Sequence, residues 1–113
     1  MIEEKSLTLE NAVLVGVVNS RQDENQSKEY MDELEFLTYT AGGQVLERFT
    51  QKIDPPNPKT FIGSGKIQEV LEFVKKHDIS SVIFDDELTP AQQGNIEKML
   101  KIKVLDRTGL ILD

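Results

Sequence analysis

Residues 12–18, with the sequence Ala-Val-Leu-Val-Gly-Val-Val, decide the fold class of this chain. They form a nearly unbroken apolar run that is rich in valine. A strand of an antiparallel sheet usually alternates apolar and polar residues, because one of its faces meets solvent. An unbroken run instead indicates a strand buried on both faces, as in a parallel sheet covered by helices.

The segment after this strand has the pattern of an amphipathic helix. A polar loop over 19–26 precedes Ser27, which we expect to cap the helix. The helical spacing predicts a buried stripe made of Tyr30, Leu34, Leu37 and Ala41. Gly42 and Gly43 would end the helix, since glycine tolerates the left-handed backbone after a last turn.

A second strand and a second helix follow. Residues 45–53 mix β-prone and charged residues, which predicts a strand at an edge of the sheet. Three prolines in 54–59 forbid helix and favour a stiff connection. Residues 60–66 then lead into a helix that ends near His77, with a buried stripe of Ile67, Val70, Leu71 and Val74.

The last third of the chain repeats the alternation. Residues 81–84 predict a short buried strand, and 103–105 predict another. Between them Thr89 is expected to cap a helix, with Pro90 at its first position and Gln92 closing a capping box. The residues expected to face inward are Ala91, Ile96, Met99 and Leu100, and Gly94 costs this helix about 1 kcal/mol relative to alanine.

The alternation of strands and helices predicts βαβ units with right-handed crossovers. We therefore expect an α/β fold: one domain with an open, mostly parallel four-stranded sheet and helices packed on it. The expected strand order is 2-1-3-4, with the charged second strand at an edge. The length of 113 residues fits one domain.

Composition excludes several classes of protein. The chain is 38% apolar and 29% charged, which is ordinary for a globular domain. It has no cysteine for a disulfide or thiolate site, and no apolar run near the ~20 residues of a membrane helix. The acidic start around Glu3 and Glu4 is unlike a secretory signal, so we expect a cytoplasmic protein without a membrane span.

The charge is unevenly distributed along the chain. The net charge is −7, yet residues 48–76 hold six basic and three acidic side chains. This window is where an anion would be attracted, although solvated surface lysines explain the same pattern. The candidates for contact with an anion or with RNA are Arg48, Lys59, Gly63, Ser64, Gly65, Lys66 and, nearer the end of the chain, Arg107.

Residues 63–66, Gly-Ser-Gly-Lys, invite comparison with a phosphate-binding loop, but the motif fails at both ends. Thr60 stands where its first glycine belongs, and Ile67 stands where its Mg²⁺-binding hydroxyl belongs. A weaker hypothesis remains, in which the amides at the helix start and Lys66 bind a phosphate. The alternative is a tight turn in which Ser64 caps the helix.

Asp85 and Asp86 follow a buried strand, at the end of the sheet where open α/β folds bind ligands. Receiver domains accept a phosphoryl group on a carboxylate at such a position. They also need an acidic pair after the first strand, where this chain has Asn19, Ser20 and Arg21. The alternative is that both carboxylates complement the next helix N-terminus. His77 is the only histidine, and we find no catalytic set of residues and no metal-binding cluster.

Several stretches together resemble the N-terminal domain of the HflX family of GTPases. They are A-V-L-V-G-V (12–17), T-A-G-G (40–43), T-F-I-G-S-G-K-I-Q-E-V (60–70), V-I-F-D-D-E-L-T-P-A-Q-Q-G-N-I-E (82–97) and V-L-D-R-T-G-L-I-L-D (104–113). Gly94 departs from the larger helix former expected there. The apolar segment 109–113 stops abruptly, so we expect residues 1–113 to be a piece of a longer protein; the alternative is a tail that packs on this domain.

The resemblance implies a function for the longer protein. Members of the family associate with the large ribosomal subunit and split or rescue stalled ribosomes. It implies that GTP, Mg²⁺ and the catalytic residues belong to a GTP-binding domain after Asp113, with no cofactor in residues 1–113. It also implies that this domain touches ribosomal RNA and influences the GTPase. The alternatives are a stand-alone nucleotide-binding module and a receiver-like phosphoacceptor.

Overall fold

The computed structural model describes residues 10–20 and 23–112 of the chain. The acidic residues Glu3 and Glu4, as well as Arg21 and Asp113, lie outside the described residues. Helices and strands alternate along the chain in the order β1 (Glu10–Val18), α1 (Glu24–Thr40), β2 (Gly43–Lys52), α2 (Ser64–Lys76), β3 (Ser81–Phe84), α3 (Pro90–Leu100), β4 (Lys103–Asp106) and α4 (Arg107–Leu112).

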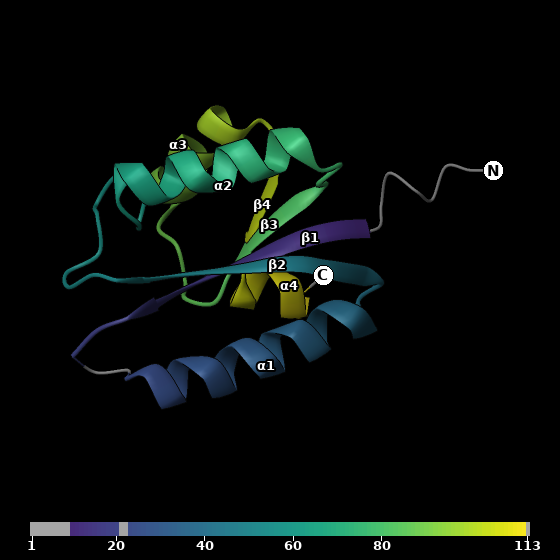
Figure 1. Ribbon diagram of the computed structural model, residues 1–113, viewed down its shortest axis with the longest axis horizontal. Coiled ribbons are helices and arrows are strands. Elements are labelled where there is room, and N and C mark those ends of the chain that lie inside the picture. The colour runs from purple at the N-terminus through teal and green to yellow at the C-terminus, as the bar shows by residue number, and fades with distance from the viewer. Residues whose placement is uncertain (1–9, 21–22, 113) are drawn as a thin grey trace.

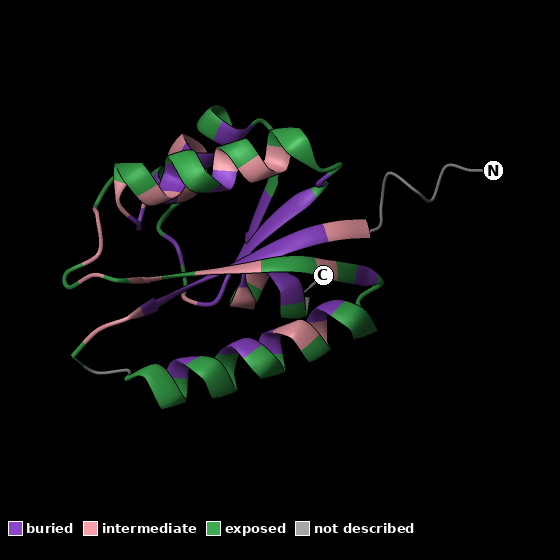
Figure 2. Cartoon of the chain, in the orientation of Figure 1, coloured by how far each residue is buried: buried purple, intermediate pink, exposed green. Residues whose placement is uncertain are grey.

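The four strands form one sheet in the order β2-β1-β3-β4, and every pair of neighbours is parallel. The predicted fold class and strand order are therefore confirmed. Helices α1 and α4 cover one face of the sheet, and α2 and α3 cover the other (Figure 1). β1 lies at the centre of this arrangement, which explains why Ala12 to Val17 are buried (Figure 2).

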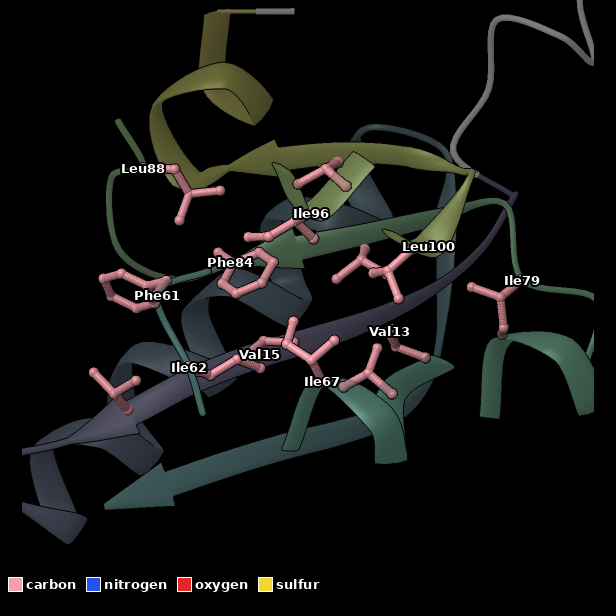
Figure 3. Close-up of a cluster of buried hydrophobic side chains, with 14 residues drawn as sticks. Val13, Val15, Phe61, Ile62, Ile67, Ile79, Phe84, Leu88, Ile96 and Leu100 are labelled. Atoms are coloured by element: carbon pink, nitrogen blue, oxygen red, sulfur yellow. The ribbon is translucent and has the colours of Figure 1, made fainter. Parts of the chain in front are cut away.

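Each face of the sheet has its own apolar core. Under α2 and α3, fourteen buried residues pack together, among them Val13, Val15, Phe84 and Ile96 (Figure 3). Under α1 and α4, a smaller cluster contains Leu14, Met31, Leu34, Ile83 and Leu110. Leu110 shows that the apolar segment at the end of the chain packs partly on this domain, while Ile111 beside it is 60% exposed.

Helix α1 begins earlier than the sequence predicts. Asp23 is the N-cap, and it forms a capping box with Gln26, so Ser27 lies inside the helix and does not cap it. The buried residues of α1 are Ser27, Met31, Leu34 and Thr38, which recur every three or four positions. The prediction that Tyr30 and Ala41 face the core was wrong, since both are exposed.

Helix α3 begins as predicted, with Thr89 as N-cap, Pro90 at the first turn and Gln92 completing the capping box. Its buried residues are Gln92, Ile96 and Leu100, which recur every four positions. Ala91 and Met99 lie off this line and are exposed, against the prediction. Gly42, with a φ of +95°, is the left-handed residue after α1, as the glycine pair predicts.

Candidate functional site

Of the three long helices, α2 is the one whose first-turn backbone amides have no side-chain cap. Gly63 is its N-cap and has no side chain that could accept from the first-turn amides, whereas Asp23 and Thr89 do so for α1 and α3. Ser64 is the first residue of the helix, so the alternative in which it caps α2 is wrong. The turn therefore presents backbone N–H groups and the positive end of the helix dipole.

Hydrogen bonds hold the loop before α2 in place. Gly63 donates its amide to Oε1 of Gln51 at 2.9 Å, which ties the turn to β2. Asn57 Oδ1 accepts from the amides of Lys59 and Thr60 at 2.8 and 3.3 Å. From α3, Gln92 donates to the carbonyl of Asn57 at 2.9 Å. The loop is thus fixed against α3 by contacts that local sequence patterns do not reveal.

Two lysines accompany this turn. Lys59 is exposed, and its ammonium has no salt-bridge partner among residues 10–20 and 23–112. Its carbonyl accepts from Nδ2 of Asn95 at 3.0 Å, which fixes the backbone while the side chain stays accessible. Lys66 lies in the first turn of α2, and its half-buried side chain forms an ion pair at 3.1 Å with Glu69, which is itself exposed. Such a pair is weak and can yield to a stronger anion.

Arg48 lies on the other face of the sheet from this turn. Its Nη2 lies 2.8 Å from carboxylate oxygens of both Asp32 and Glu35 on α1. The hydrogen bonds that Asp32 accepts from Arg48 and then from Lys28 hold the pKa of Asp32 below its ordinary value. The structure therefore does not bring Arg48 together with Lys59 and Lys66, although all three share one charge window in the sequence.

Arg107 also binds carboxylates of this domain. Its Nη2 donates to Oδ1 of Asp85 at 2.6 Å and to the carbonyl of Tyr30 at 2.8 Å, and its Nη1 donates to Glu33 at 3.0 Å. The side chain of Asp85 is only 3% exposed, so the Asp85 end of this ion pair is shielded from water. Local sequence patterns do not predict the contact between Arg107 and Glu33, because the two residues are 74 positions apart.

Asp86 lies beside this network but does not join it. Burial raises its pKa, and the neighbouring charge of Asp85 raises it further, while Arg107 opposes both effects. The part of the chain that the structure describes contains no group of three or more His, Cys, Asp or Glu side chains placed to hold a metal ion.

A pocket of about 400 Å³ opens at the carboxyl ends of β1 and β3, the switch point where open α/β sheets bind ligands. Its lining includes Asp54, Asp86 and Glu87, and the hydroxyl of Ser20 donates to Asp54 at 2.6 Å. The acidic lining disfavours a phosphate.

In the described ranges no helix is long and apolar enough to cross a bilayer.

Comparison with known proteins gives a consistent result. The family described as "GTP-binding GTPase N-terminal" matches residues 28–113. The GTPase HflX of Flavobacterium psychrophilum is 55% identical over 113 residues, covering 100% of this chain and 27% of that protein. The GTPase HflX of Escherichia coli K12 is 41% identical over 104 residues, covering 92% and 24%.

Solved structures agree in fold. A complex of SsGBP with GDP superimposes with a TM-score of 0.70 and 28% identity, covering 91% of this chain and 28% of that one. A GTP-binding protein from Sulfolobus solfataricus in complex with GDP gives a TM-score of 0.65 and 26% identity, covering 91% and 29%. The chain spans about a quarter of the length of the curated relatives that it matches.

Proposed function

This chain belongs to the HflX family of GTPases, and from that premise we propose that it is the N-terminal accessory domain of a longer, ribosome-associated GTP hydrolase. In this proposal the domain contacts RNA of the large ribosomal subunit in the cytoplasm and modulates GTP hydrolysis during ribosome splitting or rescue. The catalytic groups, GTP and Mg²⁺ belong to the rest of the protein, which includes a GTP-binding domain that is a partner of this one.

The absence of a phosphate-binding loop over 60–67 supports this division of labour. Gly63, Ser64, Gly65 and Lys66 do not fit a GTP site, because the required first glycine and the Mg²⁺-binding hydroxyl are missing. In addition, α2 does not follow directly from a buried central strand; it follows edge strand β2 and a proline-rich loop. No step of GTP hydrolysis is assigned to these residues.

The observation that carries the RNA contact is the α2 N-terminus without a side-chain cap, which follows closely in the chain on Lys59, an exposed lysine that forms no ion pair with any described residue. The amides of Ser64, Gly65 and Lys66 offer donors to a phosphate oxygen, and the helix dipole favours its negative charge. An acidic protein can bind RNA with such a local face, provided that its acidic surfaces point away. Arg48 and Arg107 are secondary contacts, since each must first leave its carboxylates.

The test is binding of the full-length protein to purified large ribosomal subunits, measured by co-sedimentation at several salt concentrations. We expect the Lys59→Glu and Lys66→Glu double variant to bind at least tenfold more weakly at physiological salt. The slope of log affinity against log salt should become shallower by about one to two units, because each lost phosphate contact removes nearly one counterion.

The matched control reverses the two lysines at the other end of the same helix, Lys75→Glu and Lys76→Glu, where the helix dipole is negative. This variant has the same charge change and should retain most of the binding. Equal loss in both double variants would reduce the effect to net charge, and full binding by the Lys59 and Lys66 variant would overturn the RNA contact.

A second candidate function is direct binding of a nucleotide at the α2 N-terminus, which the same exposed amides favour. Titration with GTP or ATP, followed through the amide signals of residues 63–66, distinguishes it from the RNA contact. A saturable shift at millimolar nucleotide would support a nucleotide site, and unchanged signals would remove that candidate.

A further inference from the structure

Ser27 carries an unexplained buried hydroxyl. The residue is 3% exposed, and its Oγ has no hydrogen-bond partner among the described residues. It is the one buried side-chain oxygen or nitrogen there that lacks a partner. A hydroxyl left unsatisfied in this way costs about 1–3 kcal/mol, and native proteins rarely keep one without a reason. The residue is not a helix cap, because Asp23 has that role.

The same serine lines a pocket between α1 and the C-terminal parts of β1 and β2. The pocket has a volume of about 390 Å³, within the range of small-molecule sites. Its polar lining residues are Glu24, Ser27, Lys28, Arg48, Thr50, Gln51 and Lys52. It lies on the α1 face of the sheet and is therefore separate from the α2 N-terminus of the proposed RNA contact.

The lining is cationic, although the chain as a whole is acidic. It contains three basic side chains and one acidic side chain, Glu24. Lys28 pairs with Asp32, and Lys52 pairs with Glu24, in both cases at 3.2 Å with the lysine side chain 74% exposed. Exposed pairs of this kind contribute little, so both ammonium groups are free to turn toward a bound anion. Arg48 stays fixed between its two carboxylates.

Helix α1 adds to this field. Its first turn begins at Glu24, so the positive end of a 17-residue helix lies at the pocket. A capping box of Asp23 and Gln26 closes this end, in which the Asp23 carboxylate accepts from the amide of Gln26.

From the unpartnered hydroxyl, the cationic lining and the helix start, we infer that this pocket binds a small anion that carries a phosphoryl group. Ser27 Oγ donates to one phosphoryl oxygen, and Lys28 and Lys52 neutralise the charge. The pocket exceeds the size of the phosphoryl group alone, so it also accommodates a small polar body such as a sugar ring. The site goes beyond the proposed function, which uses this face only through Arg48 as a secondary RNA contact.

The test is a titration of the chain with inorganic phosphate and with ribose 5-phosphate at constant ionic strength, followed through backbone amide signals. We expect saturable shifts in 24–31 and 48–52, with tighter binding of ribose 5-phosphate because it also fills the remaining volume. If inorganic phosphate binds equally well, the polar body is not recognised and that part of the inference is wrong. Shifts that never saturate, or that fall on all exposed lysines alike, would overturn the site.

Two variants separate binding from folding. Ser27→Ala removes the hydroxyl and keeps the packing, so we expect at least fivefold weaker binding with an unchanged or higher free energy of unfolding. Lys52→Ala, at an exposed position, should weaken binding by a similar factor, whereas the control Lys76→Ala on the opposite face should not. A less stable Ser27→Ala variant would mean that the hydroxyl has an internal partner, and unchanged binding would mean that it touches no ligand; either result contradicts the inference.

Discussion

The guanidinium of Arg107 and the carboxylate of Asp85 meet at 2.6 Å where two neighbouring strands of the sheet end. Asp85 directly follows β3, and Arg107 is the first residue of α4 after β4. The same guanidinium reaches Glu33 and the carbonyl of Tyr30 on α1. One side chain thus connects the sheet, α1 and the short helix at the end of the described chain.

Replacement of Arg107 by glutamine should destabilise the domain by about 2–4 kcal/mol, because it leaves the buried charge of Asp85 without its partner. Urea unfolding followed by circular dichroism measures this loss. The double variant Asp85→Asn with Arg107→Gln should recover part of it, since no unpaired charge remains. In contrast, Arg48→Gln should cost at most about 1 kcal/mol, because Asp32 and Glu35 can turn to solvent. If Arg107→Gln and Arg48→Gln lowered the free energy of unfolding equally, the burial of Asp85 would not explain the larger cost expected at Arg107.

Gly94→Ala should stabilise the domain by about 1 kcal/mol, because glycine in a helix interior loses more backbone entropy than alanine. A Cβ at position 94 would meet no atom within 4 Å, so packing does not oppose the change. Thermal unfolding should shift upward by several degrees. Gly42→Ala is the contrasting variant: its φ of +95° is strained for alanine, and its midpoint should fall. A loss at position 94 would indicate a contact that the structure does not contain.

Asp86→Asn should stabilise the domain at pH 7. The pKa of Asp86 is raised in the folded state above the ordinary value of 3.8, so ionisation of this group opposes folding. The folded state binds the proton more tightly, and stability therefore falls as pH rises from the unfolded-state pKa through the raised one. Thermal midpoints of both proteins across pH should converge as pH falls below about 4. A constant difference at all pH values would exclude this carboxyl as the cause, and Asp78→Asn at an exposed position is the control.

Thr89→Ala should cost about 1 kcal/mol, since it removes the side-chain oxygen that accepts from the amide of Gln92 at 3.1 Å. The loss should exceed that for Ser64→Ala, because Ser64 is exposed and does not cap α2. Urea unfolding compares the two variants. Similar losses would mean that Ser64 satisfies the α2 turn after all.

Local sequence predicted the parts of the structure that local chemistry controls. The valine-rich run 12–18 indicated a strand buried on both faces, and the alternation along the chain indicated a parallel sheet with a charged edge strand; both are confirmed. Thr89, Pro90 and Gln92 predicted the start of α3 because a capping box joins residues three positions apart. The same reasoning was wrong for α1, because Asp23 and not Ser27 occupies the N-cap position, and the two residue types cap a helix about equally well.

Tertiary structure alone decided which charged groups from different elements meet, since only Lys28–Asp32 and Lys66–Glu69 follow from helical spacing among the ion pairs named above. In the sequence Arg48, Lys59 and Lys66 share one basic window, yet the fold directs Arg48 to the carboxylates of α1 and leaves Lys59 exposed beside α2. Arg107 and Asp85 come together because two parallel strands end at the same edge of the sheet. Hydrophobic periodicity determines which face of an element is buried, but crossovers between strands determine the neighbours of that face. For this reason the sequence by itself determined the fold class and family resemblance of this protein, while only the three-dimensional packing decided which of its cations are free to bind a partner.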